Sequence, residues 1–134
     1  RFRERCVGGA RPGHPLLDRE VTAERWAAGR HVLVSRRGRE RGSADEAGAR
    51  LGLKRRIAVV VGTFSEALAL VRGSDLLAEV PERYTGRLRD GLASFPLPVE
   101  MPEPTISLMW HPRLDADPAH RWLRGVVREV CGAG

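Results

Sequence analysis

The 134-residue sequence has only two cysteines, and it contains no apolar run of the roughly 18 residues that a membrane-spanning helix needs. Cys6 and Cys131 have no second cysteine or histidine at metal-ligand spacing, so we expect no zinc or other metal site. We expect two buried thiols of a cytoplasmic protein, with one disulfide as the alternative. The sequence starts without methionine or a signal-peptide apolar region, which predicts part of a longer protein, a processed start being the alternative.

Lysine is almost missing, although the net charge is +6 and the isoelectric point is about 10.8. Such a charge balance is compatible with nucleic-acid binding. Lys54 is the single lysine, the arginines are scattered, and the one dense basic run, residues 36–42, has no interleaved aromatic side chains that stack on bases. We expect this run to be a solvated loop, with contact to an anion or to DNA as the alternative.

Catalytic motifs are missing as well. The sequence has no G-x-S-x-G, no HExxH, no Walker A motif and no G-x-G-x-x-G after a strand. The four histidines lie far apart, without a carboxylate or nucleophile at triad spacing: His14, His31, His111 and His120. The motifs therefore give no support for an enzyme, and we expect neither catalysis nor a cofactor.

What the sequence does contain is an alternation of short apolar runs with helix-like segments. Strands are predicted at 3–10, 31–35, 57–61, 76–80 and 105–111. Helices are predicted within 22–29, 43–53, 63–73, 81–91 and 117–130, with N-caps at Thr22, Ser43, Thr63 and Asp117. Residues 92–104 contain four prolines, which predicts an extended segment that crosses the domain.

This alternation predicts an α/β fold with a parallel sheet and right-handed crossovers. In such a sheet, ligands bind outside the carboxyl ends of the strands. After the strand 57–61, Gly62 lets a ligand approach the backbone, and the helix start favours a carboxylate or phosphate. Thr63 adds a hydroxyl and Phe64 an apolar face. The alternative is structural: Thr63 caps the helix, Glu66 closes a capping box, and Phe64 lies in the core.

Five segments form a wider pattern: ARPGHPLL, HVLVSRRG, VVVGTFSEALALVRGSDLLAEVPER, FPLPVEMP and ISLMWHPRLDADPAHRWLR. In sequence and spacing they resemble the effector-binding domain of LysR-type transcriptional regulators, the last segment most specifically. The similarity extends over nearly the whole chain. The resemblance implies a fold like type 2 periplasmic binding proteins, in which two α/β subdomains, joined by crossing strands, enclose an inducer cleft.

On this resemblance, residues 11–98 are the second regulatory subdomain. Residues 1–10 and 99–134 are then crossing strands and the C-terminal part of a first subdomain that is incomplete here. The implied inducer contacts are Gly62, Thr63, Phe64, Ser35, Arg36, His14, Met109 and Trp110. Many members have proline where this chain has Gly62, so the loop differs locally.

The resemblance also implies partners. The inducer is expected to be small, and aromatic or carboxylated, and the regulator to be a homo-oligomer, a dimer or a tetramer. DNA is expected to be contacted only through a DNA-binding domain that this chain does not contain, and no membrane is involved.

Two other function classes stay open beside the ligand sensor. One is a free-standing solute-binding protein of the periplasmic type with a similar fold. The other, a small basic nucleic-acid-binding domain, rests on the net charge alone. The sequence upstream of Arg1 separates the three classes, because a winged helix-turn-helix, a secretion signal or a start codon identifies them in turn.

Overall fold

The structure is a computed structural model that describes residues 2–35, 43–101, 105–106 and 115–131. Its chain divides into two compact units. Unit 2 comprises Arg5–Pro102, and unit 1 comprises Arg1–Glu4 together with Glu103–Gly134. Unit 2 is thus inserted between the two halves of unit 1. The predicted subdomain 11–98 lies within unit 2, and its exact boundaries stay a prediction.

Unit 2 is built on a five-stranded sheet with the order β4-β3-β5-β2-β6. Its strands are β2 (Cys6–Ala10), β3 (Arg30–Val34), β4 (Arg56–Val61), β5 (Leu76–Pro81) and β6 (Ala93–Pro96). β3 is parallel to both β4 and β5, as the alternating pattern predicts. β2 runs antiparallel to both of its neighbours, so the sheet is mixed rather than purely parallel.

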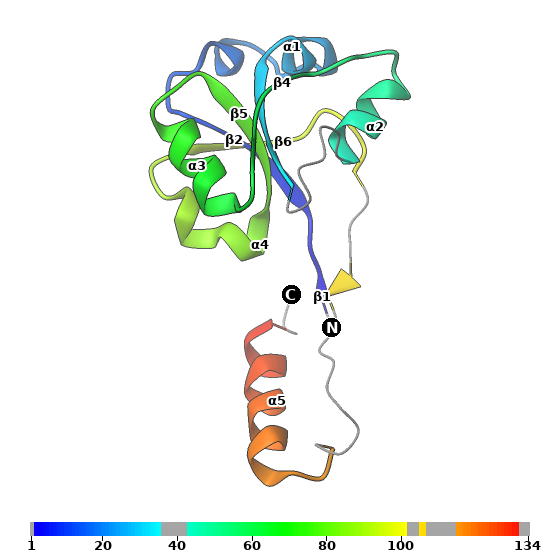
Figure 1. The fold of residues 1–134 in the computed structure, drawn as a ribbon, viewed down its shortest axis with the longest axis vertical. Coiled ribbons are helices and arrows are strands. Elements are labelled where there is room, and N and C mark those ends of the chain that lie inside the picture. Colours follow the sequence, from blue (N-terminus) through cyan, green and yellow to red (C-terminus); the bar gives the residue numbers. More distant parts are fainter. Residues whose placement is uncertain (1, 36–42, 102–104, 107–114, 132–134) are drawn as a thin grey trace. The chain divides into compact units, whose positions relative to one another are not determined.

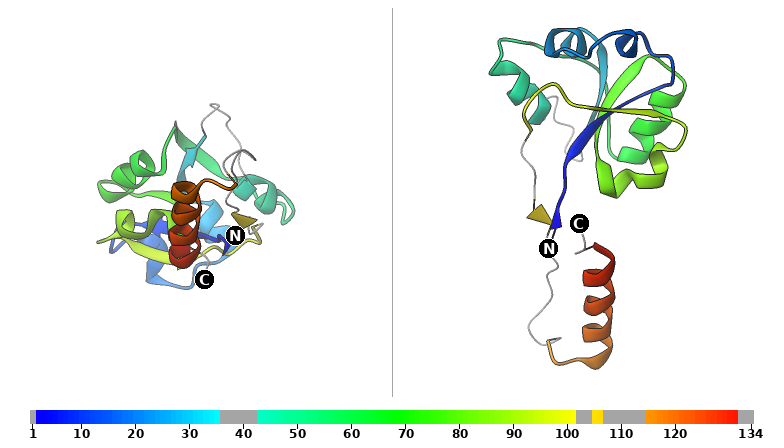
Figure 2. Two further views of the ribbon diagram at one scale, coloured as in Figure 1. Left: turned by 90° about the horizontal axis from the view of Figure 1, so that it is seen from below. Right: turned by 180° about the vertical axis from the view of Figure 1, so that it is seen from behind.

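Helices cover both faces of this sheet (Figures 1 and 2). The helices of unit 2 are the 3₁₀ helix η1 (Pro15–Asp18), α1 (Ala23–Ala27), α2 (Ser43–Ala49), α3 (Phe64–Arg72), α4 (Glu82–Thr85) and the 3₁₀ helix η2 (Gly86–Arg89). α1 and α2 pack on one face through an apolar cluster that includes Trp26, Ala47 and Leu77. α3 packs on the other face against Val80 and its neighbours, since successive strand side chains alternate between the faces.

Three predicted helix starts are confirmed by hydrogen bonds from a backbone N–H of the first turn to the capping side chain. The pairs are Arg25 with Thr22 Oγ1 (3.2 Å), Glu66 with Thr63 Oγ1 (3.2 Å) and His120 with Asp117 Oδ1 (3.1 Å). Each acceptor precedes its helix and satisfies an N–H that has no partner within the helix. The fourth predicted cap is Ser43. α2 begins at this residue, whose side chain lies outside the described part.

β2 contains two consecutive glycines, Gly8 and Gly9, which disfavour a strand. It nevertheless lies inside the sheet, between β5 and β6. A Cβ at Gly8 would come within 2.3 Å of the Phe95 ring of β6. The glycine is therefore needed for packing, because it leaves room for a large side chain from the neighbouring strand.

Two further segments differ in detail from the predictions. The predicted helix 81–91 is divided into α4 and η2. The predicted crossing segment 92–104 contains a short strand, β6, which lies at the edge of the sheet and ends at Pro96. An edge position tolerates proline, because no neighbouring strand needs its missing N–H.

Unit 1 contains three described elements, β1 (Phe2–Arg3), β7 (Thr105–Ile106) and α5 (Pro118–Cys131). β1 and β7 pair antiparallel. α5 begins at Pro118 as predicted, and its Trp122 is 71% exposed. The rest of the predicted strand 105–111 lies outside the described residues. No helix in the described ranges has the length and apolar character needed to cross a membrane.

Candidate functional site

The carboxyl ends of the three parallel strands lie at one edge of the sheet, which we call the carboxyl edge. The carboxyl edge consists of the residues that directly follow Val34 of β3, Val61 of β4 and Pro81 of β5. The N–H of Ser35 donates to Val61 O at 2.8 Å and extends the parallel ladder past β3. Ser35 is half-buried, and its strand lies between β4 and β5. The structure thus brings two predicted site segments, Ser35 and Gly62–Phe64, to the same edge.

The Thr63 hydroxyl takes part in helix capping at this edge. Its oxygen accepts the N–H of Glu66 at 3.2 Å, and its O–H donates to the Glu66 carboxylate at 2.9 Å. The structural role considered for these two residues is therefore present. Both are exposed, and the second lone pair of the hydroxyl oxygen stays available to a ligand. The Glu66 carboxylate also places a negative charge at the start of α3, where the helix dipole stabilises it.

Gly62 has open space around it. Within the described part of the chain, no heavy atom other than those of Gly62 and its two chain neighbours lies within 4 Å of a Cβ built at this position. Its backbone is also outside the left-handed region that favours glycine. At Gly8 the neighbouring Phe95 ring excludes a side chain, whereas at Gly62 the packing leaves room for one. A ligand can therefore approach the backbone of Gly62 without displacing a neighbouring side chain.

Phe64 is half-buried and contacts Tyr84 of α4, a residue that sequence reasoning missed. The two rings meet edge to face, with centroids 5.9 Å apart and an interplanar angle of 67°. Phe64 packs against the core under α3, whereas Tyr84 is 70% exposed. The sequence contained a signal for Tyr84, because it follows the predicted strand 76–80 just as Gly62 follows the strand 57–61.

His14 lies at the opposite edge, where the parallel strands begin. Its Nδ1 accepts the N–H of Leu16 at 2.9 Å and caps η1. Its Nε2–H donates to the carbonyl of Asp75, directly before β5, at 2.7 Å. The side chain is buried, and both ring nitrogens hold the fold together. The structure therefore does not bring His14 together with Gly62–Phe64.

The other predicted contacts, Arg36, Met109 and Trp110, lie outside the described residues, as does the basic run 36–42. Within the described ranges, no group of three or more His, Cys, Asp or Glu side chains is arranged to hold a metal ion.

A second group that sequence reasoning missed is buried on the α1 and α2 face. We call it the ionic cluster, and it consists of Arg55, Asp45 and Glu79 with the adjoining rings of His31 and Trp26. The Arg55 guanidinium donates to both carboxylate oxygens of Asp45, at 3.0 and 2.8 Å, and also to Glu79. Its carbon lies 5.4 Å from the centroid of the Trp26 ring, and 1% of the side chain is exposed. Arg55 thus joins α1, α2 and β5 to the start of β4.

The ionic cluster sets the protonation of its members. Burial, and then the charge of Arg55, lowers the pKa of His31 to about 4, so this imidazole is neutral at pH 7. Its Nε2–H donates to Trp26 O at 2.8 Å. Burial raises the pKa of Glu79, and Arg55 opposes that shift. Among the described residues, Oε2 of Glu79 has no hydrogen-bond partner, and this buried atom adds to the cost of ionising the carboxyl.

A groove of about 780 Å³ lies between α2 and β4, beside the ionic cluster. Its described lining is Asp45, Ala49, Leu53, Lys54, Arg55 and residues 57–60. Neither Ser35 nor Gly62–Phe64 belongs to that described lining, which on β4 extends as far as Val60.

The fold defines a class of protein before any comparison is made. An open α/β sheet whose parallel strands end beside a helix start is a ligand-binding arrangement. The family model described as "LysR substrate binding domain" matches residues 2–132, and the chain belongs to this family. The predicted LysR-type resemblance is thereby confirmed.

Curated relatives agree with this assignment. The chain is 38% identical over 125 residues to the HTH-type transcriptional regulator SyrM of Rhizobium meliloti (strain 1021), covering 91% of this chain and 38% of the relative. It is 34% identical over 122 residues to the HTH-type transcriptional activator NahR of Pseudomonas putida, covering 90% and 41%. The chain thus spans less than half the length of these relatives. They are transcriptional regulators rather than enzymes.

Solved structures show the same fold. The regulatory domain of MexT, a transcriptional activator in Pseudomonas aeruginosa, has a TM-score of 0.71 at 28% identity, covering 96% of this chain and 62% of that chain. The effector-binding domain of QuiR, solved in complex with shikimate, has a TM-score of 0.62 at 16% identity, covering 98% and 63%. The second likeness shows the fold alone. The predicted α/β fold of the periplasmic-binding-protein type is confirmed.

Proposed function

We propose that this chain senses a small-molecule effector on behalf of a LysR-type transcriptional regulator. The main support is the family match over residues 2–132, in a fold whose carboxyl edge presents the exposed Thr63. In the proposal the effector contacts Ser35 and Gly62–Phe64. It is aromatic or carboxylated, because Phe64 offers a ring and the first-turn N–H groups of α3 attract a carboxylate.

Three contacts belong to the proposed site by resemblance alone: Arg36, Met109 and Trp110. His14 is left out, because its ring is committed to η1 and β5 at the other edge.

The effector acts in this proposal by a population shift. It binds one arrangement of the regulator better than another and so biases the position of attached DNA-binding domains. The regulator is a cytoplasmic homo-oligomer, a dimer or a tetramer, and it contacts DNA through a separate domain. Two curated relatives are HTH-type regulators, which supports DNA contact through a separate domain.

The experiment that tests the site replaces Thr63 by valine, which removes the hydroxyl and keeps the volume. Because the cap of α3 is lost, we expect the variant to lose about 1 kcal/mol of stability. We also expect a smaller rise in melting temperature with benzoate and other aromatic carboxylates, because in this proposal the Thr63 O–H turns from the Glu66 carboxylate to donate to the ligand carboxylate. Thermal shift measurements on the parent chain and the variant give both quantities.

Ser74→Ala is the matched control. Ser74 donates to Leu70 O at 2.6 Å and accepts the N–H of Leu76 at 3.1 Å, at the opposite end of α3. This variant loses a structural hydroxyl but keeps the ligand response. Equal ligand responses in Thr63→Val and the parent would show that Thr63 is not a contact. If no ligand in the panel stabilises the parent, the proposed aromatic or carboxylated effector is wrong.

A further inference from the structure

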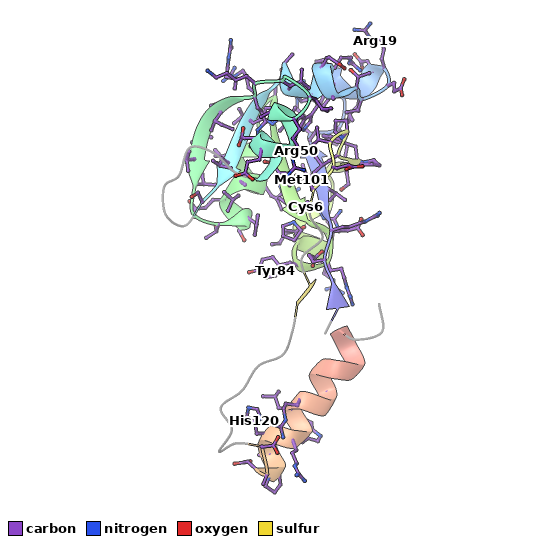
Figure 3. The ribbon with its side chains drawn as sticks, turned by 90° about the vertical axis from the view of Figure 1, so that its right-hand side faces the viewer. Cys6, Arg19, Arg50, Tyr84, Met101 and His120 are labelled. Carbon is purple, nitrogen blue, oxygen red and sulfur yellow. The ribbon has the colours of Figure 1, made fainter. Side chains whose placement is uncertain are left out.

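Tyr84 combines high exposure with a fixed position. It is the only tyrosine of the chain, and 70% of it is exposed. Figure 3 shows its side chain projecting outward from α4. The Tyr84 ring is nevertheless anchored on one side, because it contacts Phe64, which packs against the core under α3. The contact leaves most of the Tyr84 ring free for a further partner.

Tyr84 lies in α4, which has only four residues. Contacts with neighbouring residues therefore hold this helical turn in place. The buried Thr85 donates to Pro81 O at 2.6 Å. The Arg89 guanidinium donates to Thr85 Oγ1 at 3.0 Å and to Glu82 O at 2.7 Å. Arg5 forms a bidentate pair with Glu82, at 3.1 and 2.8 Å. These bonds hold the backbone of the turn, and the contact with Phe64 positions the ring, so a ligand that meets Tyr84 has little of the turn to order on binding.

The position of α4 places this ring beside the proposed effector site. α4 follows β5 directly, Ser35 follows β3, and Gly62–Phe64 follows β4. These are three neighbouring parallel strands, and their ends form the carboxyl edge. The ring contact with Phe64 places Tyr84 next to the segment Gly62–Phe64.

We propose that Tyr84 is a specificity-determining residue of the effector site, and that with Phe64 it forms an aromatic corner for the ring of a planar aromatic effector. This inference rests on the proposed function. The two rings stand at 67° to each other, so a third ring is able to stack on one of them while meeting the edge of the other. The Tyr84 hydroxyl is both donor and acceptor, which suits a polar substituent on that third ring.

The test compares two carboxylates of the same size, benzoate and cyclohexanecarboxylate, by titration calorimetry on the full chain. Tyr84→Leu removes the ring and keeps an apolar side chain. We expect it to weaken benzoate binding about three- to tenfold and cyclohexanecarboxylate binding less than about twofold. Tyr84→Phe keeps the ring and is expected to retain the preference for benzoate. Leu88→Ala, at an exposed apolar residue of η2, is the matched control and leaves both affinities unchanged.

A second measurement needs no substitution. Because Tyr84 is the only tyrosine, incorporation of 3-fluorotyrosine gives one ¹⁹F resonance from the folded chain. This resonance is expected to shift with benzoate along the calorimetric binding curve.

The outcomes separate the two proposals. Benzoate binding that leaves the ¹⁹F resonance unmoved, or equal losses for both carboxylates in Tyr84→Leu, overturns the role of Tyr84 and leaves the effector site standing. If neither carboxylate binds the parent chain, the proposed effector class fails, and the aromatic corner fails with it.

Discussion

The two faces of the unit 2 sheet are stabilised in different ways. The described apolar cluster under α3 has aliphatic buried members: Val7, Val32, Ala67, Leu68, Val71, Ala78 and Val80. Under α1 and α2 the apolar cluster adjoins a buried guanidinium, Arg55, with two carboxylates and a neutral histidine. An aliphatic face contributes stability in proportion to the area it removes from water. An ionic cluster contributes only while every partner is present, because burying a lone charge is costly.

This difference predicts how much stability a substitution costs on each face. An aliphatic side chain that is shortened leaves a cavity, and the loss scales with its size. A member of the ionic cluster that is removed leaves its partners buried and uncompensated. Four expected outcomes test this contrast.

Arg55→Met is expected to have the largest effect, a loss of about 3–5 kcal/mol in the free energy of unfolding. Asp45 and Glu79 would then share a buried site without their counter-charge. Urea denaturation at pH 7 measures the loss. The double variant Arg55→Met with Glu79→Gln is expected to regain part of it, since one stranded charge is removed. A loss below about 1 kcal/mol in the single variant would show that the cluster is solvated rather than buried.

Leu68→Ala, on the aliphatic face, is expected to cost about 3 kcal/mol, because it removes a fully buried side chain under α3. The loss relative to the parent should be the same at pH 7 and pH 5, since the described members of that cluster are apolar and do not titrate. Urea denaturation at both pH values measures it. A loss that changes between the two pH values would mean that the faces are coupled through the sheet.

His31 is expected to make stability fall as the pH drops from 6.5 toward 4. Its pKa is about 4 in the folded chain against an ordinary 6.5, so the unfolded chain binds a proton that the folded chain excludes. By pH 5 this linkage removes about 2 kcal/mol. Glu79, whose pKa is raised, acts in the opposite direction.

His31→Gln isolates the histidine contribution, because it keeps a hydrogen-bonding side chain and removes the titration. The drop in stability between pH 7 and pH 5 should be smaller in this variant than in the parent by about 2 kcal/mol. Equal drops would show that His31 titrates normally.

The Arg5–Glu82 pair is expected to have the smallest effect. It has the bidentate geometry of Arg55–Asp45, with donor distances of 3.1 and 2.8 Å, but the Arg5 side chain is 64% exposed. A double-mutant cycle with Arg5→Met and Glu82→Gln should give a coupling energy of about 0.5 kcal/mol that disappears in 1 M salt. A coupling above about 2 kcal/mol would contradict the view that burial, rather than geometry, separates the two pairs.

The aliphatic face was predictable from the sequence, and the ionic cluster was not. Strands such as 57–61 are marked by β-branched runs, and helix starts such as Thr63 depend on a cap three residues from its partner, so both signals are local. Arg55 and Arg56 are neighbours of the same type, yet Arg55 is a buried residue and Arg56 is exposed. What distinguishes them is the position of Asp45 and Glu79, which only the tertiary fold supplies.

The candidate site shows the same limit. Gly62–Phe64 and Ser35 were found because parallel strands place their carboxyl ends at one edge. The same rule applies to Tyr84, but its ring contact with Phe64 depends on how α3 crosses the sheet. His14 was assigned to the site from the resemblance alone, and a resemblance between segments does not say at which end of a sheet a side chain lies.

The pairing of β1 with β7 has a consequence for the order of folding. It joins Phe2 to Ile106, so an unfolded chain would close a loop of about 100 residues at an entropic cost of about 4 kcal/mol. Once unit 2 has folded, Val7 and Pro96 are already paired, and only two short connections are left to close. The β1–β7 ladder is therefore expected to form last, with unit 2 acting as the template that brings the halves of unit 1 together.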